Sequence, residues 1–97
     1  MIQSFRNQQT EDLFNGKRNK KTAKVLPLEL WDTAARRLTQ INRVTELQHL
    51  GIPPGNHLEA LRGDRKGQHS IRINDKYRIC FQWAADGAHD VEITDYH

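Results

Sequence analysis

The chain has 97 residues, of which 36% are hydrophobic and 28% charged, and this length excludes two independently folding domains. The single cysteine excludes an internal disulfide, and the five histidines show no zinc-ligand spacing with it. The net charge of +3 favours a polyanionic partner. We therefore expect one domain over residues 1–97, working without a metal or another cofactor.

Residues 1–6 lack the apolar stretch of a secretory signal, and no run of about 18 apolar residues occurs in the chain. We therefore expect a cytoplasmic protein that does not contact membranes. The lysines and arginines gather mainly in two basic zones, residues 17–24 and residues 62–78.

The first part of the chain predicts a short strand followed by helices. Residues 2–5 are expected to form the strand, and a helical turn is expected to begin at a capping Thr10 and to end at Gly16. Residues 17–24 are basic and nearly free of apolar residues, a pattern compatible either with a loop or with part of a charged helix.

Residues 27–43 carry the strongest helical pattern. The apolar residues that recur there at helical spacing are Leu30, Trp31, Ala34, Ala35, Leu38 and Ile41. One more turn is expected over residues 45–50, and the glycines and prolines of residues 51–56 predict a loop.

The second half of the chain predicts four extended runs, at residues 58–61, 68–74, 77–84 and 90–96. Short turns between them indicate an antiparallel meander. The expected fold class is α+β, with an N-terminal strand and two main helices packed on one face of a twisted, mainly antiparallel β-sheet.

Period-two alternation sorts the last three runs into two faces. The apolar face is expected to carry Ile71, Ile73, Tyr77, Ile79, Phe81, Trp83, Val91 and Ile93. Keeping these residues together requires turns with an odd number of residues, which pairs Ile73 with Tyr77 and Phe81 with Ile93.

On the opposite face, the same register places Arg72 across from Arg78, and Arg78 across from Tyr96. Two arginines directly opposed on neighbouring strands repel each other, so we expect a bound anion or a nearby carboxylate beside them. A phosphate fits this position.

Three motifs give this pattern a family resemblance. The segments Leu61-Arg-Gly-Asp-Arg-Lys-Gly67, Tyr77-Arg-Ile-Cys-Phe81 and Asp95-Tyr-His97 occur in the order and with the spacing of HigB-type toxins of the RelE/ParE superfamily. The opening Met-Ile-Gln-Ser-Phe and the short helix before a longer one resemble that family too, so the likeness covers essentially the whole chain.

The resemblance implies a RelE-like fold and a toxin of a type II toxin-antitoxin system. Such a toxin enters the ribosomal decoding site, contacts ribosomal RNA and cleaves messenger RNA as a metal-independent endoribonuclease. The resemblance also implies a helix-turn-helix, HigA-like antitoxin, through which alone the toxin reaches operator DNA.

Carried over by motif position, the catalytic candidates are Arg78, His97, Tyr96, Arg62, Glu59 and Asp95. Arg78 is the first choice and Arg62 the second for stabilising the charged transition state, because a guanidinium grips two phosphate oxygens. His97 is the candidate general acid. Tyr96 is expected to stack on a base or to orient the 2′-hydroxyl, and Asp95 belongs to the terminal cluster.

Glu59 is the candidate general base and also a departure from the family pattern. The family often has a histidine at this position, three residues before Arg62, whereas the nearest histidine here is His57, two residues earlier. The identity of the base therefore stays open, and a carboxylate in place of an imidazole is the simplest interpretation.

Eight further cations are expected to contact RNA phosphates without taking part in catalysis, and for Lys17 to Lys24 a merely solvated face is the alternative. They are Arg72, Arg65, Lys66, Lys17, Arg18, Lys20, Lys21 and Lys24. Trp31 and Trp83 fall in apolar patterns and are expected in the core, and Cys80 is expected to be a small packing residue.

Two other classes of function remain open. A ParE-like toxin with this fold would poison DNA gyrase without cutting RNA, although the terminal Asp95-Tyr-His97 and the basic loop disfavour it. A non-enzymatic RNA-binding module would bind with strong salt dependence and cleave nothing. Primer extension on ribosome-bound message separates these from a nuclease.

Overall fold

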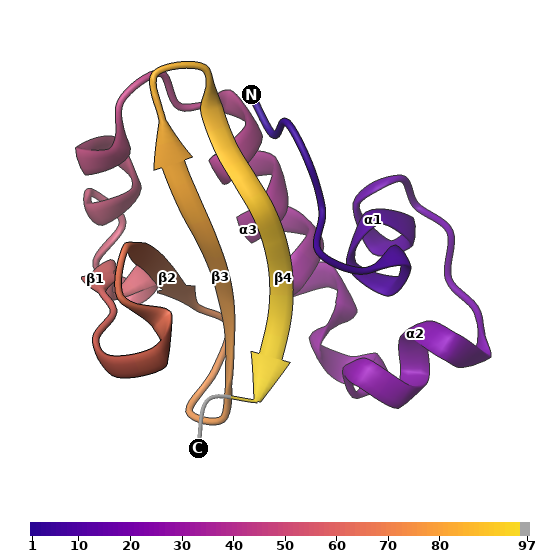
Figure 1. Ribbon diagram of the computed structural model, residues 1–97. Helices are drawn as coiled ribbons and strands as arrows, with labels where there is room; N and C mark the ends of the chain where they lie inside the picture. The colour runs from indigo at the N-terminus through magenta and orange to yellow at the C-terminus, as the bar shows by residue number, and fades with distance from the viewer. Residues whose placement is uncertain (96–97) are drawn as a thin grey trace.

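A computed structural model describes residues 1–95. Helices cover one face of a four-stranded antiparallel sheet whose strand order is β1-β2-β3-β4 (Figure 1), which confirms the α+β expectation. The helices are α1 (Gln8–Phe14), α2 (Lys20–Val25) and α3 (Trp31–Arg43). The strands are β1 (Glu59–Ala60), β2 (Gln68–Arg72), β3 (Tyr77–Ala84) and β4 (Gly87–Asp95).

The N-terminal segment runs parallel to β4 at the edge of the sheet. It forms two isolated bridges, Ile2 with Ala88 and Phe5 with Val91, instead of the regular strand expected over residues 2–5. Asp90 lies between the bridges with a left-handed backbone (φ 53), and its N–H donates to the Ser4 hydroxyl. The parallel pairing is interrupted at Asp90, because the Asp90 N–H donates to a side chain and not to the backbone of the N-terminal segment.

Helix α1 is capped by Asn7, so the prediction that Thr10 caps it was wrong. The Asn7 side chain accepts a hydrogen bond from the Thr10 N–H at 2.9 Å. Thr10 itself is buried, and its hydroxyl accepts from the Ile93 N–H at 3.1 Å, which joins α1 to β4.

The basic segment 17–24 includes a short helix. Asn19 accepts hydrogen bonds from the N–H groups of Lys21 and Thr22 and thereby starts α2. The long helix α3 follows a 3₁₀ turn over Leu28–Leu30 and buries Ala34, Leu38 and Ile41 completely, as its pattern predicted.

Between α3 and β1 the chain forms two 3₁₀ turns. The first, Leu47–Gly51, overlaps the turn expected over residues 45–50. The second, Pro54–Asn56, lies inside the segment expected to be an irregular loop. Its Asn56 is fully buried and donates to the Gln40 side chain and to the Leu50 carbonyl, so this connection is anchored on α3.

The register between β2 and β3 agrees with the prediction. Arg72 lies opposite Arg78, and the Ile73 N–H donates to the Tyr77 carbonyl at 2.9 Å. The apolar face formed by these strands packs under the helices, and Ile71, Ile79 and Phe81 are completely buried there.

The predicted register between β3 and β4 was wrong by two residues. Ile93 lies opposite Ile79 instead of Phe81, and Arg78 lies opposite Thr94 instead of Tyr96. The connection is a two-residue turn between Ala84 and Gly87, and the register shifts between Cys80 and Gln82. Here Asp90 and Val91 of β4 lie opposite one β3 residue.

This bulge explains the error. An even-numbered turn would reverse the faces of β4, but the extra residue of a bulge reverses them once more. Ala88 and Val91 therefore both reach the core, although they are three residues apart. Among residues 1–95, no helix combines the length and the apolar character needed to cross a membrane.

Candidate active site

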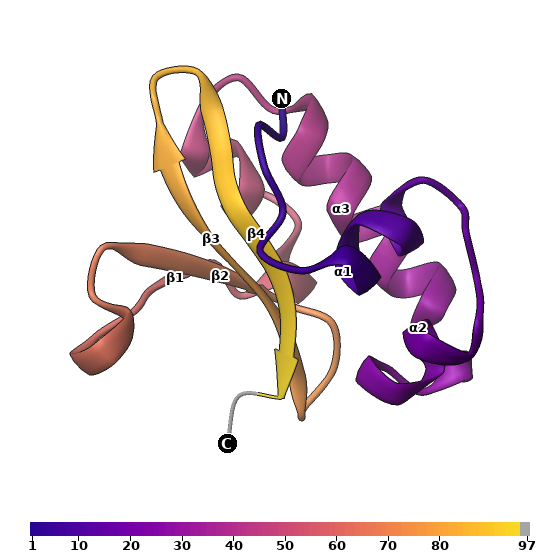
Figure 2. The same cartoon turned by 45° about the vertical axis from the view of Figure 1, so that its right-hand side comes forward.

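The sheet face turned away from the helices carries the polar row expected from the alternation. Cross-strand partners share a face, and the pairings align Ser70 with Cys80 and Glu92, and Arg72 with Arg78 and Thr94. Figure 2 shows the helices on one side of the sheet and the β1–β2 connection projecting on the other side. We call the face of these six residues the polar face.

Arg78 is the most tightly held cation on the polar face. Its Nε donates to the Ser70 hydroxyl at 2.7 Å and its Nη2 to the His57 carbonyl at 2.6 Å. The same Nη2 lies 3.1 Å from a carboxylate oxygen of Glu59. The residue is only 9% exposed, so its guanidinium is fixed in position before any ligand arrives.

The His57 carbonyl is held in place from the helical side of the molecule. His57 has a left-handed backbone (φ 46), which is uncommon for a residue other than glycine. It directly follows the buried Asn56, which α3 and the Leu50 carbonyl hold. A chain of contacts therefore runs from α3 through this connection to Arg78.

Separate carboxylates accompany the two opposed arginines, as expected. Glu59 lies opposite Ser70 and pairs with Arg78, while Asp75 in the β2–β3 turn pairs with Arg72. The Glu59 side chain is 51% exposed, which leaves room for it to meet a ligand. The structure thus brings Glu59 and Arg78 together, whereas Arg72 pairs with Asp75 in the adjacent β2–β3 turn.

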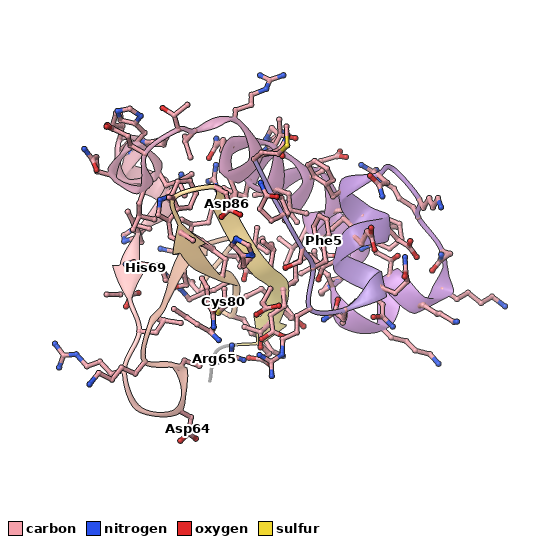
Figure 3. The ribbon with its side chains drawn as sticks, turned by 45° about the horizontal axis from the view of Figure 1, so that its top comes forward. Phe5, Asp64, Arg65, His69, Cys80 and Asp86 are labelled. Carbon is pink, nitrogen blue, oxygen red and sulfur yellow. The ribbon has the colours of Figure 1, made fainter. Side chains whose placement is uncertain are left out.

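The β1–β2 loop places its three cations differently. Arg62 and Lys66 are exposed, whereas Arg65 is folded back. One Arg65 nitrogen, Nη1, donates to the Glu92 carboxylate at 2.8 Å and to the Gln68 side chain at 3.1 Å. Figure 3 shows Arg65 turned towards the sheet and Asp64 pointing away at the outer end of the loop.

The C-terminal cluster is described only in part. Asp95 lies opposite Tyr77 and 3.6 Å from the Lys76 ammonium, so it does not join Arg78 in the row. The two other members, Tyr96 and His97, lie outside the described residues.

The cations of the first basic zone do not gather on the polar face. Helix α2 lies in the helical layer (Figure 2), and Lys17, Lys20, Lys21 and Lys24 are exposed. Arg18 pairs with Asp32 at 3.0 Å and lies over the Trp31 ring. The two basic zones therefore form separate surfaces.

Cys80 and the two tryptophans behave as expected. Cys80 is completely buried, and burial raises the pKa of its thiol. Nearby charges have smaller effects: Arg65 and Arg78 lower this pKa, and Glu92 raises it. Trp31 is buried in the core, and the partly buried Trp83 packs against the core cluster.

The sequence interpretation missed Ser70 and Glu92. Ser70 falls on the polar face in the register that was predicted correctly, so alternation alone contained its signal. Glu92 was hidden by the two-residue error in β4, because the wrong register puts Thr94 instead of Glu92 across from Cys80.

Within residues 1–95, histidine, cysteine, aspartate and glutamate side chains form no group of three or more that could hold a metal ion. The site chemistry that these residues offer consists of a fixed guanidinium, a half-exposed carboxylate and the loop cations.

Comparisons with known proteins identify relatives of this chain. It is 38% identical over 63 residues to the toxin HigB-1 of Vibrio cholerae, and this match covers 65% of the chain and 66% of that protein. It is 34% identical over 58 residues to an uncharacterised protein of Haemophilus influenzae, covering 60% of the chain and 57% of that protein. It is 32% identical over 97 residues to the endoribonuclease HigB of Proteus vulgaris, covering 100% of both.

The fold and the site define a small basic α+β protein with a largely buried, hydrogen-bonded arginine on the sheet face turned away from its helices. Residues 3–97 match the HigB-like toxin family, described as the RelE-like toxin of the type II toxin-antitoxin system HigB. The chain therefore belongs to the HigB-like toxins.

Proposed function

We propose that this toxin is an endoribonuclease that cleaves messenger RNA in the ribosomal decoding site. The observation that carries the proposal is the guanidinium of Arg78, fixed by Ser70 and His57 beside the carboxylate of Glu59. The Proteus vulgaris relative, which bears the name endoribonuclease, supports the same assignment.

The proposed reaction uses the RNA's own nucleophile. Glu59 accepts the proton of a ribose 2′-hydroxyl, whose oxygen forms a bond to the adjacent phosphorus while the bond from phosphorus to the 5′-oxygen breaks. The 5′-oxygen leaves with a proton from His97, so the products are a 2′,3′-cyclic phosphate and a 5′-hydroxyl. Tyr96 stacks on a base next to the cleaved bond.

Arg78 stabilises the extra negative charge on the phosphate in this proposal. A donor that is fixed in advance needs no reorganisation when the charge develops, and losing such a donor costs about 10²- to 10³-fold in rate. Arg62, exposed on the β1–β2 loop, supplies a second positive charge.

The proposed partners follow from the same assignment. A helix-turn-helix, HigA-like antitoxin neutralises the toxin in the cytoplasm, and operator DNA is bound through that antitoxin. Ribosomal RNA contacts the exposed cations of α2 and Lys66 of the β1–β2 loop.

Primer extension on ribosome-bound message tests the function. We expect the wild-type protein to produce discrete cleavage ends and Arg78→Lys to lower the cleavage rate about 10²-fold, because lysine keeps the charge but not the fork that reaches Ser70 and His57. Removal of His97 should lower it about 10²- to 10⁴-fold.

Circular dichroism and thermal unfolding of each variant show whether the fold persists. Arg36→Ala, on the exposed face of α3, is the matched control and should cleave like the wild type. Wild-type protein that binds ribosomes and yields no cleavage ends, or an Arg78→Lys variant with full activity, would defeat the proposal.

A further inference from the structure

A carboxylate lies on the face that we propose to bind RNA, where its charge opposes phosphate binding. Glu92 projects from the middle of β4, and its side chain is only 14% exposed. It accepts a hydrogen bond from Arg65 at 2.8 Å and lies 3.8 Å from the Arg6 guanidinium. A carboxylate lowers the positive potential of this surface and so weakens phosphate binding. Glu92 must therefore have another role, such as holding a cation in position.

The contact with Arg65 joins two distant parts of the sheet. Arg65 ends the 3₁₀ turn Gly63–Arg65 of the β1–β2 loop, whereas Glu92 belongs to the strand at the other end of the sheet order. The arginine therefore reaches across β3 to its partner. The residue of β3 directly opposite Glu92 is the small, buried Cys80.

The same arginine also holds the loop at its return into the sheet. Its Nη1 donates to Gln68, the first residue of β2. Arg62 and Lys66, the exposed cations of the loop, lie on either side of the turn that Arg65 ends. The position of both cations thus depends on how firmly Arg65 is held.

We propose that Glu92 is a positioning residue that fixes Arg65 and, through it, the β1–β2 loop, so that Arg62 faces the cleaved phosphate. This inference rests on the proposed nuclease function. It assigns Arg65 to orienting the loop instead of contacting phosphate, and it makes a largely buried negative charge necessary for an activity on RNA.

The test measures kcat and KM for cleavage on programmed ribosomes. Glu92→Gln keeps the size of the side chain but loses the charge that holds Arg65, so we expect kcat to fall by about tenfold to 10²-fold, since small displacements of a reacting group cost that much. KM should not rise, because removal of a negative charge does not weaken RNA binding.

Arg65→Gln provides an independent variant, since its side chain is 31% exposed and its loss disturbs the core less. We expect the same fall in kcat, and we expect the double variant Glu92→Gln with Arg65→Gln to be no worse than the poorer single variant. Arg65→Lys should restore part of kcat. Glu29→Gln, the same change at an exposed position, is the matched control.

The outcomes separate the possible failures. If the wild type does not cleave, the nuclease function fails first and the inference falls with it. If the wild type cleaves but Glu92→Gln keeps or raises kcat, Glu92 only repels RNA and the inference is wrong. If Arg65→Gln raises KM at unchanged kcat, Arg65 is a phosphate contact, which also overturns it. If Glu92→Gln unfolds below the assay temperature, the kcat and KM of Arg65→Gln alone test the inference.

Discussion

At the scale of single residues, the polar face depends on groups that are held before a ligand binds. Arg78 donates to a hydroxyl and to a carbonyl from two different nitrogens, which the single ammonium of a lysine cannot reproduce in the same geometry. Its pairing with Glu59 places an acceptor for a proton next to a stabiliser of negative charge. Proximity of this kind is what the proposed reaction requires.

The reactivity of Cys80 tests whether solvent reaches the side chains that lie beneath the charged groups of the polar face. Because burial raises the pKa of its thiol, a smaller fraction is thiolate near pH 8 than in an unfolded chain. We expect iodoacetamide to label native Cys80 far more slowly than the same protein in urea, as measured by mass spectrometry. Rapid stoichiometric labelling of the native protein would show that Cys80 is accessible to solvent.

At the scale of elements, helix starts and strand irregularities connect distant parts of the chain. Asn7 starts α1, which leaves the Thr10 hydroxyl available to accept from the Ile93 N–H of β4. The bulge at Asp90 returns the apolar residues of β4 to the core after the two-residue turn. It also interrupts pairing with the N-terminal segment.

The capping assignment predicts the effect of two substitutions. Asn7→Ala should lower the free energy of unfolding by about 1 kcal/mol, because the Thr10 N–H loses its acceptor. Asn7→Ser should change it by only a few tenths of a kcal/mol, since serine caps about as well. Urea denaturation followed by circular dichroism measures both. Equal losses in the two variants would argue that Asn7 acts otherwise than as a cap.

At the scale of the whole molecule, the positive charge is divided between two surfaces. The cations of α2 lie in the helical layer, and those of the β1–β2 loop lie by the polar face (Figure 2). Two separate basic surfaces let the protein contact phosphates of one large RNA partner at two places, as the proposed function requires.

This division predicts separable effects on binding and cleavage. The triple variant Lys20→Ala, Lys21→Ala and Lys24→Ala should raise KM for programmed ribosomes on the order of tenfold at physiological salt and reduce the salt dependence of KM. Its kcat at saturating ribosomes should stay at the wild-type value, because α2 belongs to the helical layer (Figure 2), whereas Arg78 lies on the polar face of the sheet. An unchanged KM would show that α2 contacts no phosphate.

Local patterns in the sequence were enough for several features. The burial of α3 follows from apolar residues at helical spacing, and the β2–β3 register follows from alternation across the three-residue turn that Asn74 begins. The position of Arg78 on the open face follows from the same alternation. These features depend on periods of 3.6 and 2 residues and on neighbouring residues, which a sequence displays directly.

Only the tertiary structure decided the partners of the candidate site. The bulge at Asp90 sets which residue of β4 faces Cys80, and a bulge reflects packing against the N-terminal segment and the core. The contacts of Arg78 with the His57 carbonyl, and of Arg65 with Glu92, join residues 21 and 27 positions apart. Their formation depends on the free energy of the whole packed arrangement, which no local period encodes.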